Sequence, residues 1–231
     1  MEGCKLTRLR TVLVCLVLLL AVAWPAGVLA GAKGSEFQGF PGSLGTGPLT
    51  PASQCPLYNN VTPLAVYNYN YNVGLLSQCD SQWGSISMST CAHTICQAGC
   101  ALTSTSMIFR YFLCTKHPDD LNACLGVKAC PIWWAYASQT CSESKAVLYC
   151  GTTWTFDYHL MAEFLRCGWP PILELVKGTS THWVVVRTVA GDEYSPSSYS
   201  VNDPNGGLLR NLTYFTNNGW TGHTLVAYGP R

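Results

Sequence analysis

Cysteine is the residue that most constrains how this chain can fold. The sequence contains thirteen cysteines, and two of them, Cys4 and Cys15, lie in an N-terminal segment that we expect to be removed. The remaining eleven are Cys55, Cys79, Cys91, Cys96, Cys100, Cys114, Cys124, Cys130, Cys141, Cys150 and Cys167. Exported proteins pair their cysteines, so an odd number leaves one thiol over. If ten form five bridges, the eleventh is a candidate nucleophile, but parity alone does not identify it.

Residues 1–30 have the layout of a secretory signal peptide. Basic residues, the last of them Arg10, precede an apolar run over residues 12–24, and Val28 and Ala30 have the spacing of a cleavage site. The run is shorter than the ~20 residues that a membrane span needs. We therefore expect cleavage after Ala30, secretion, and no stable membrane association of the mature chain.

One domain is expected over residues 55–231, which is long enough for a substantial core. Residues 31–54 are rich in Gly, Ser, Pro and Thr and are typical of a flexible linker or a short pro-segment. Only 11% of the chain is charged and its formal net charge is +1, without a basic stripe, so nucleic acid is not an expected partner. Asn60 and Asn211 begin N-glycosylation sequons.

The order of the predicted elements indicates an α+β domain, with helices first and strands later. Helices are predicted from Cys100 onward and over residues 156–167, where Gly168 follows as a stop. Between them, residues 114–150 resemble a disulfide-bound, loop-rich insertion with short helices. Strands are predicted at residues 171–176, 182–189, 199–202, 211–215 and 224–228.

Cys100 lies where a helix is predicted to begin, and this position suits a reactive thiol. Leu102, Ile108 and Phe112 follow it at helical spacing. The thiolate is the nucleophilic form of cysteine, and the positive end of a helix with its unpaired N–H groups favours that anion. Cys100 is therefore the candidate nucleophile.

His182, Asp203 and Gln78 supply the other groups that a thiol hydrolase needs. His182 opens a strongly apolar predicted strand, where it could accept and return a proton. Asp203 closes the next predicted strand, and antiparallel pairing could bring its carboxylate beside the imidazole to orient it. Gln78 could donate a side-chain N–H, beside the backbone N–H of Cys100, to a developing oxyanion.

Each of these residues also has an ordinary structural interpretation. Cys100 could be a half-cystine, His182 a residue at a strand end, and Asp203 part of a turn before Pro204. What distinguishes the set is its order, in which the cysteine opens a helix and the histidine opens a strand.

Neither a metal nor another cofactor is expected. The tightest group of potential zinc ligands is Cys91, His93, Cys96 and Cys100. Its spacings lack the paired Cys-x-x-Cys knuckles of common structural zinc sites, and export favours disulfides. Zinc remains the competing use of these cysteines.

Five short motifs follow one another along residues 76–206. They are Gln78-x-Asp80-x-x-Trp83-Gly84, Gly99-Cys100-x-x-Thr103-Ser104-x-x-Met107, Gly168-x-Pro170-Pro171-Ile172, His182-Trp183-Val184-Val185-Val186 and Asn202-Asp203-Pro204. In order and spacing the chain resembles the C39-like peptidases of the papain-like cysteine peptidase clan. The resemblance implies a papain-like fold in which Cys100, His182 and Asp203 form the triad and Gln78 lies at the oxyanion hole.

The chain departs from that family in its cysteine-rich insertion over residues 114–150. We expect a secreted, disulfide-stapled α+β domain with an N-terminal helical half and a C-terminal antiparallel sheet, which cleaves peptide bonds in a peptide or protein substrate. Two alternatives remain open. One is an amidase or acyltransferase on the same fold, and the other is a catalytically inactive binding module in which Cys100 is disulfide-bonded.

Overall fold

The computed structural model describes residues 66–89, 91–143, 147–153 and 156–230. The predicted signal peptide (1–30), the predicted linker (31–54) and the sequon at Asn60 lie outside these residues. Among the residues described, no helix is both long and apolar enough to cross a membrane.

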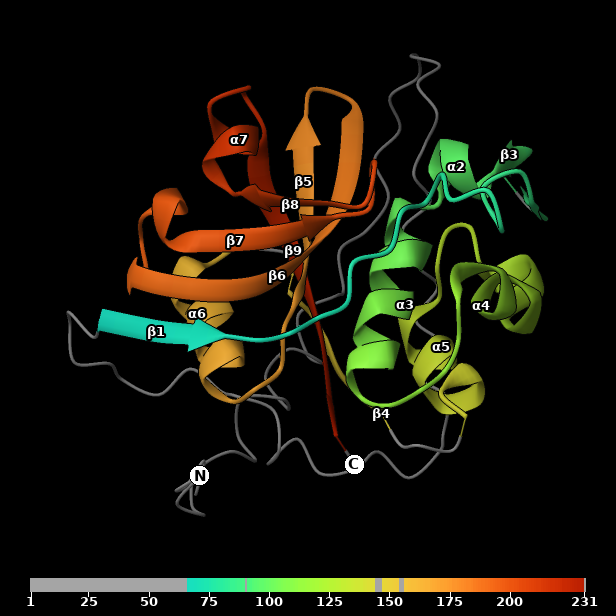
Figure 1. Cartoon of the computed structure of the whole chain (residues 1–231), viewed down its shortest axis with the longest axis horizontal. Coiled ribbons are helices and arrows are strands. Elements are labelled where there is room, and N and C mark those ends of the chain that lie inside the picture. The colour runs from blue at the N-terminus through green and yellow to red at the C-terminus, as the bar shows by residue number, and fades with distance from the viewer. Residues whose placement is uncertain (1–65, 90, 144–146, 154–155, 231) are drawn as a thin grey trace, which may run out of the picture. The chain divides into compact units, whose positions relative to one another are not determined.

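Helices dominate residues 95–141 of the described chain. A two-stranded antiparallel sheet, β2 (Ser87–Met88) and β3 (His93–Thr94), leads directly into the short helix α2 (Ile95–Ala98). The helices that follow are α3 (Cys100–Tyr111), α4 (Pro118–Leu125), the 3-10 helix η2 (Gly126–Lys128) and α5 (Trp134–Cys141). Helix α3 lies between the large sheet and the smaller helices α4 and α5 (Figure 1).

The large sheet is antiparallel at every pairing, and its strands follow the order β4-β9-β5-β6-β7-β8, with β1 also paired to β6. The strands are β1 (Val66–Asn70), β4 (Val147–Thr153), β5 (Ile172–Lys177), β6 (Ser180–Asp192), β7 (Tyr199–Asp203), β8 (Leu208–Asn211) and β9 (Thr221–Pro230). The helices between them are α6 (Tyr158–Arg166), the 3-10 helix η3 (Pro196–Ser198) and α7 (Thr213–Thr216).

Strand β6 contributes to both hydrophobic cores, which explains the run of three buried valines at residues 184–186. Successive side chains of a strand point to opposite faces of the sheet. Val185 accordingly packs in the core that contains Met107 of α3, whereas Val184 and Val186 pack in the core that contains Met161 of α6. A strand covered on both faces has no polar face to alternate with its apolar one.

The α+β class is confirmed, and most predicted elements are present. Helix α3 begins at Cys100, and α6 lies within the predicted range 156–167. The strand predicted at 211–215 is wrong, because β8 ends at Asn211 and α7 follows. The side-chain oxygen of Asn211 accepts hydrogen bonds from the backbone N–H and the hydroxyl of Thr213, at 2.9 and 2.6 Å, and these local bonds favour a turn at the end of β8 over a longer strand.

Strands β1 and β4 were not predicted. Along β1, buried Tyr67 and half-buried Tyr69 alternate with exposed Asn68 and Asn70, which is the pattern of a strand with one face in water. Strand β4 carries the end of the cysteine-rich segment into the sheet, where it pairs with β9.

Three disulfides join described residues, namely Cys79–Cys96, Cys91–Cys130 and Cys124–Cys141. The last two hold the segment 114–150, as predicted. Cys114, however, is buried and in no disulfide, so the expectation that Cys100 is the one unpaired cysteine is wrong. Burial raises the pKa of the Cys114 thiol, which also hydrogen-bonds the carboxylate of Glu143. Burial and this hydrogen bond therefore stabilise Cys114 as a neutral thiol outside any disulfide.

The junction between α2 and α3 requires glycine, which yields a stability prediction. A Cβ atom at Gly99 would overlap the backbone oxygen of Ile95 and approach its Cγ2 to 2.7 Å, whereas a Cβ atom at exposed Gly74 would meet nothing within 4 Å. We expect Gly99→Ala to lower the free energy of unfolding in urea by about 1–3 kcal/mol, as overpacking does. The control Gly74→Ala should stay within about 0.5 kcal/mol of the wild type. Equal stability of the two variants would contradict this account of the junction.

Candidate active site

Cys100 is the first residue of the twelve-residue helix α3, and its thiol is partly exposed and in no disulfide. Gly99 ends α2 through a hydrogen bond from its N–H to Ile95 O at 2.7 Å. Its carbonyl then accepts the N–H of Thr103 at 2.8 Å and opens α3. Two helices thus meet at one glycine, and this junction fixes the thiol at a helix N-terminus.

His182 lies near the beginning of β6, where it pairs with Leu175 of β5. Its Nε2 atom is 2.7 Å from Oδ1 of Asp203, and its side chain is only 13% exposed. Interaction with the Cys100 side chain also raises the pKa of the same imidazole. Because Asp203 occupies Nε2, the ring nitrogen that faces Cys100 is Nδ1. The imidazole therefore connects the thiol to the carboxylate.

The surroundings of His182 favour its protonated form. Burial by itself would lower the pKa of the imidazole, but the hydrogen bonds to Asp203 and Cys100 outweigh burial and raise the pKa to about 9. The rings of Phe215 and Trp220 lie 5.8 and 6.3 Å from the imidazole and limit its contact with water. A protonated imidazole next to a thiol is the arrangement that stabilises a thiolate in cysteine-dependent enzymes.

Asp203 ends β7 as a buried carboxylate with three donors. Besides His182, it accepts the backbone N–H of Asn205 at Oδ1 and the Nε–H of Arg210 at Oδ2, both at 2.9 Å. Burial alone would raise the pKa of Asp203, but the interaction with His182, together with these two donors, lowers it. The carboxylate is therefore ionised and fixed in orientation.

Arg210 is a site residue that was not predicted from the sequence. It lies on β8, which returns beside β7 after the turn at Asn205 and Gly206, and Val201 pairs with it in the sheet. Its guanidinium group also stacks on the ring of Tyr214 at 3.8 Å. A basic residue soon after an Asn-Gly turn could have suggested this contact, because the two strands of a hairpin face each other.

Gln78 is 7% exposed and is held at both its backbone and its side chain. Its backbone N–H donates to Pro204 O at 2.8 Å, beside Asp203, and its Nε2 donates to Cys96 O at 2.6 Å. Cys96 lies in α2, four residues before Cys100 along the chain. One Nε2–H of the amide is thereby occupied, and the second is left to donate elsewhere.

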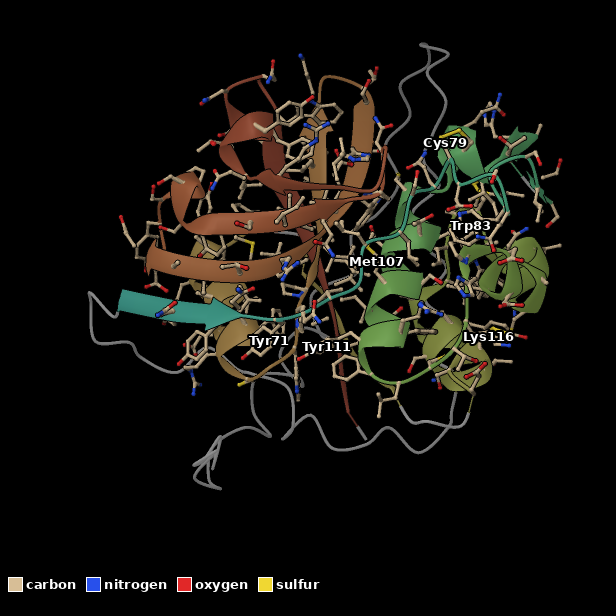
Figure 2. All side chains as sticks on the ribbon, viewed as in Figure 1. Tyr71, Cys79, Trp83, Met107, Tyr111 and Lys116 are labelled. Atoms are coloured by element: carbon tan, nitrogen blue, oxygen red, sulfur yellow. A yellow bond between two sulfur atoms is a disulfide. The ribbon has the colours of Figure 1, made fainter. Side chains whose placement is uncertain are left out.

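Polar contacts beside His182 and Asp203 join α3 to the sheet. Ser104 Oγ donates to the Trp183 carbonyl at 3.2 Å, next to His182. Asn202, beside Asp203, is fully buried, and its Nδ2 donates to Val73 O at 2.9 Å and contacts Met107 Sδ at 3.8 Å. Figure 2 shows Met107 on the side of α3 that faces the sheet.

His223 and Glu174 also form a histidine–carboxylate pair, but the contacts of the imidazole differ from those of His182. His223 Nδ1 lies 2.7 Å from Glu174 Oε2 and 2.9 Å from Thr224 Oγ1. Both oxygens contact the same ring nitrogen, so this imidazole cannot pass a proton from one of them to the other. The imidazole is also about half exposed.

The predicted zinc alternative is wrong, because Cys91 and Cys96 form disulfides with Cys130 and Cys79 and have no thiolate to offer. Within the described part of the chain, no group of three or more His, Cys, Asp or Glu side chains is arranged to hold a metal ion. The alternative of an inactive binding module predicts a bonded Cys100 and another free cysteine; Cys100 is in no disulfide, and Cys114 is in none either.

Comparisons with protein-family models, with curated proteins and with solved structures found no match to this chain.

The link between His182 and Asp203 predicts a specific titration. In Asp203→Asn the imidazole keeps a hydrogen-bond partner but loses the negative charge, so the pKa of His182 should fall from about 9 toward its ordinary value of 6.5. NMR titration of the histidine ring signals measures this change, and the His223 signal of the same sample is the internal control. An unchanged His182 titration would contradict the assigned ion pair.

The same pair should contribute to stability in a pH-dependent way. Since folding raises the pKa of His182 from 6.5 to about 9, its contribution is complete below about pH 6.5 and disappears as the pH rises through about 9. The difference in unfolding free energy between wild type and Asp203→Asn should narrow over that range.

Proposed function

We propose that this protein is a secreted cysteine peptidase with a papain-like Cys-His-Asp triad, acting on peptide or protein substrates without a cofactor. The observation that supports it most is the imidazole of His182, which contacts a thiol at a helix N-terminus on one side and a buried, ionised carboxylate on the other. The resemblance of the five sequence motifs to C39-like peptidases supports the same assignment independently of this geometry.

In the proposed reaction, the Cys100 thiolate attacks the carbonyl carbon of the scissile bond. The C–S bond forms while the carbonyl π electrons move to oxygen and create a tetrahedral oxyanion. Protonated His182 then gives its Nδ1 proton to the leaving amine as the C–N bond breaks. Water, deprotonated by the now neutral imidazole, hydrolyses the thioester and restores the ion pair.

Asp203 and Gln78 have supporting roles in this proposal. Asp203 holds Nε2–H of the imidazole, so that Nδ1 faces the thiol throughout the cycle. The second Nε2–H of Gln78 and the backbone N–H of Cys100 are the proposed donors to the oxyanion. Arg210 keeps the Asp203 carboxylate in place through Oδ2, the oxygen that the imidazole does not use.

Secretion is part of the proposal and rests on the N-terminal signal-like segment together with the disulfides. Three bridges among the described residues are typical of a chain that folds in an oxidising compartment.

Thiol labelling tests the proposed nucleophile directly. Iodoacetamide at neutral pH should modify Cys100 faster than buried Cys114, as mapped by mass spectrometry of the non-reduced protein. His182→Ala should slow labelling of Cys100 by about tenfold or more, because the thiolate loses its counter-ion. The matched control is His223→Ala, which removes another carboxylate-paired histidine of the sheet and should leave the rate unchanged. Equal rates in the two variants would refute the thiolate–imidazolium pair.

Turnover tests the reaction class. A fluorogenic peptide-amide library should reveal cleavage that both Cys100→Ala and His182→Ala reduce by at least about a hundredfold, in line with the loss of a nucleophile or a general acid. Because His182 must be protonated to release the amine, kcat/KM should decline as the pH rises through about 9. Cleavage that survives in Cys100→Ala, or hydrolysis confined to non-peptide amides, would contradict a cysteine peptidase.

A further inference from the structure

The Cys79–Cys96 disulfide lies directly beside Gln78, the proposed oxyanion donor. Cys79 directly follows Gln78, and Cys96 is the residue whose carbonyl accepts the Gln78 side chain at 2.6 Å. Figure 2 shows Cys79 next to α2, the helix that contains Cys96. One bridged cysteine therefore follows Gln78 in the chain, and the other accepts a hydrogen bond from the Gln78 side-chain amide.

The bridge adds a covalent link between two segments that also meet through the backbone hydrogen bonds from Cys96 N–H to Gly84 O at 3.0 Å and from Ile95 N–H to Ile86 O at 2.9 Å. On one side is the loop around Gln78, whose Ser77 carbonyl accepts Trp83 Nε1–H at 2.7 Å. On the other is α2, which passes through Gly99 into Cys100 at the beginning of α3. The distance between the Cα atoms of the bridged residues is 4.2 Å, so the loop is fixed against the helix that precedes the nucleophile.

From this geometry we propose that the Cys79–Cys96 disulfide is a positioning element of the active site, which holds the Gln78 amide at the oxyanion of the substrate adduct. Cys79 and Cys96 act through Gln78 and do not themselves touch the substrate. The inference rests on the proposed function, since it concerns the oxyanion formed when Cys100 attacks a carbonyl.

Two thiol reagents separate positioning from folding. Iodoacetamide alkylates the thiolate by displacing iodide, and no charge develops on a carbonyl oxygen. A peptide aldehyde instead forms a C–S bond with Cys100, and its carbonyl electrons move to the oxygen, where an oxyanion hole stabilises them. Loss of the Gln78 contact should therefore weaken aldehyde binding and leave alkylation intact.

The chain offers a matched control for removing the bridge. Cys124–Cys141 spans the same sequence separation as Cys79–Cys96, 17 residues in each case, so both bridges close loops of equal length. Loop-closure entropy then affects both deletions alike. The variants are Cys79→Ser/Cys96→Ser and Cys124→Ser/Cys141→Ser, and neither introduces a new thiol.

The experiment measures the rate of Cys100 alkylation by iodoacetamide and the Kd of a panel of short peptide aldehydes, read as protection from that alkylation. Without Cys79–Cys96, we expect alkylation within about twofold of wild type and aldehyde Kd raised by about tenfold or more. In other enzymes, deleting an oxyanion donor lowers kcat by a factor of ~10²–10³. The Cys124→Ser/Cys141→Ser variant should match the wild type in both measurements. Equal aldehyde affinity in the two variants would overturn the proposal.

A double-mutant cycle with Gln78→Ala assigns the effect to that side chain. Gln78→Ala alone should weaken aldehyde binding with alkylation unchanged, and removal of the bridge in that background should weaken it no further. An additive effect of the two changes, or a bridge variant that fails to fold while its control folds, would assign Cys79–Cys96 to general stability and overturn the positioning role. A wild-type protein that alkylates rapidly but binds no aldehyde would instead refute the proposed function.

Discussion

The antiparallel pairing of β6 with β7 is the constraint on which the rest of the candidate site depends. Val185 of β6 pairs with Asn202 of β7, and this register places the end of β7 near the beginning of β6. His182 and Asp203, separated by 21 residues in sequence, thereby come within 2.7 Å. A slip of one residue would turn one side chain to the opposite face. The apolar side chains of β6, buried in two cores, make such a slip costly.

Local signals were sufficient for the elements that carry the candidate site. The helix start at Cys100 was predictable because apolar periodicity begins there and Gly99 precedes it. The β6 strand was predictable because its apolar run is bounded by polar turns. The segment after Asn211 was mispredicted as a strand because Thr, Tyr and Phe favour strands, whereas the Asn211 side chain bonds Thr213 locally and favours a turn there.

Other features depend on long-range contacts that a sequence pattern does not record. Arg210 reaches Asp203 only after the turn at Asn205 and Gly206 is formed, and its role follows from geometry and not from a motif. Cysteine parity suggested one unpaired thiol, yet Cys114 is a second, held by burial beside Glu143. The pairing of Cys79 with Cys96 was likewise beyond prediction, because connectivity cannot be deduced from cysteine positions alone.

Disulfides and the proposed thiol nucleophile in one domain have opposite redox requirements, and the positions of the cysteines bear on both. Thiol–disulfide exchange begins when a thiolate attacks a sulfur of an existing bridge, so a thiolate at Cys100 would exchange with a bridge whose sulfur it can reach. Cys96, its nearest cysteine in sequence, is bonded to Cys79, and attack of a Cys100 thiolate on the Cys96 sulfur would release Cys79 as the leaving thiolate. Cys114 is buried with a raised pKa, which makes it a poor attacking thiol. In the proposed site, exchange at this bridge would release Cys79 and with it the contact that positions Gln78, so the proposal requires Cys100 to stay reduced while Cys79–Cys96 stays oxidised.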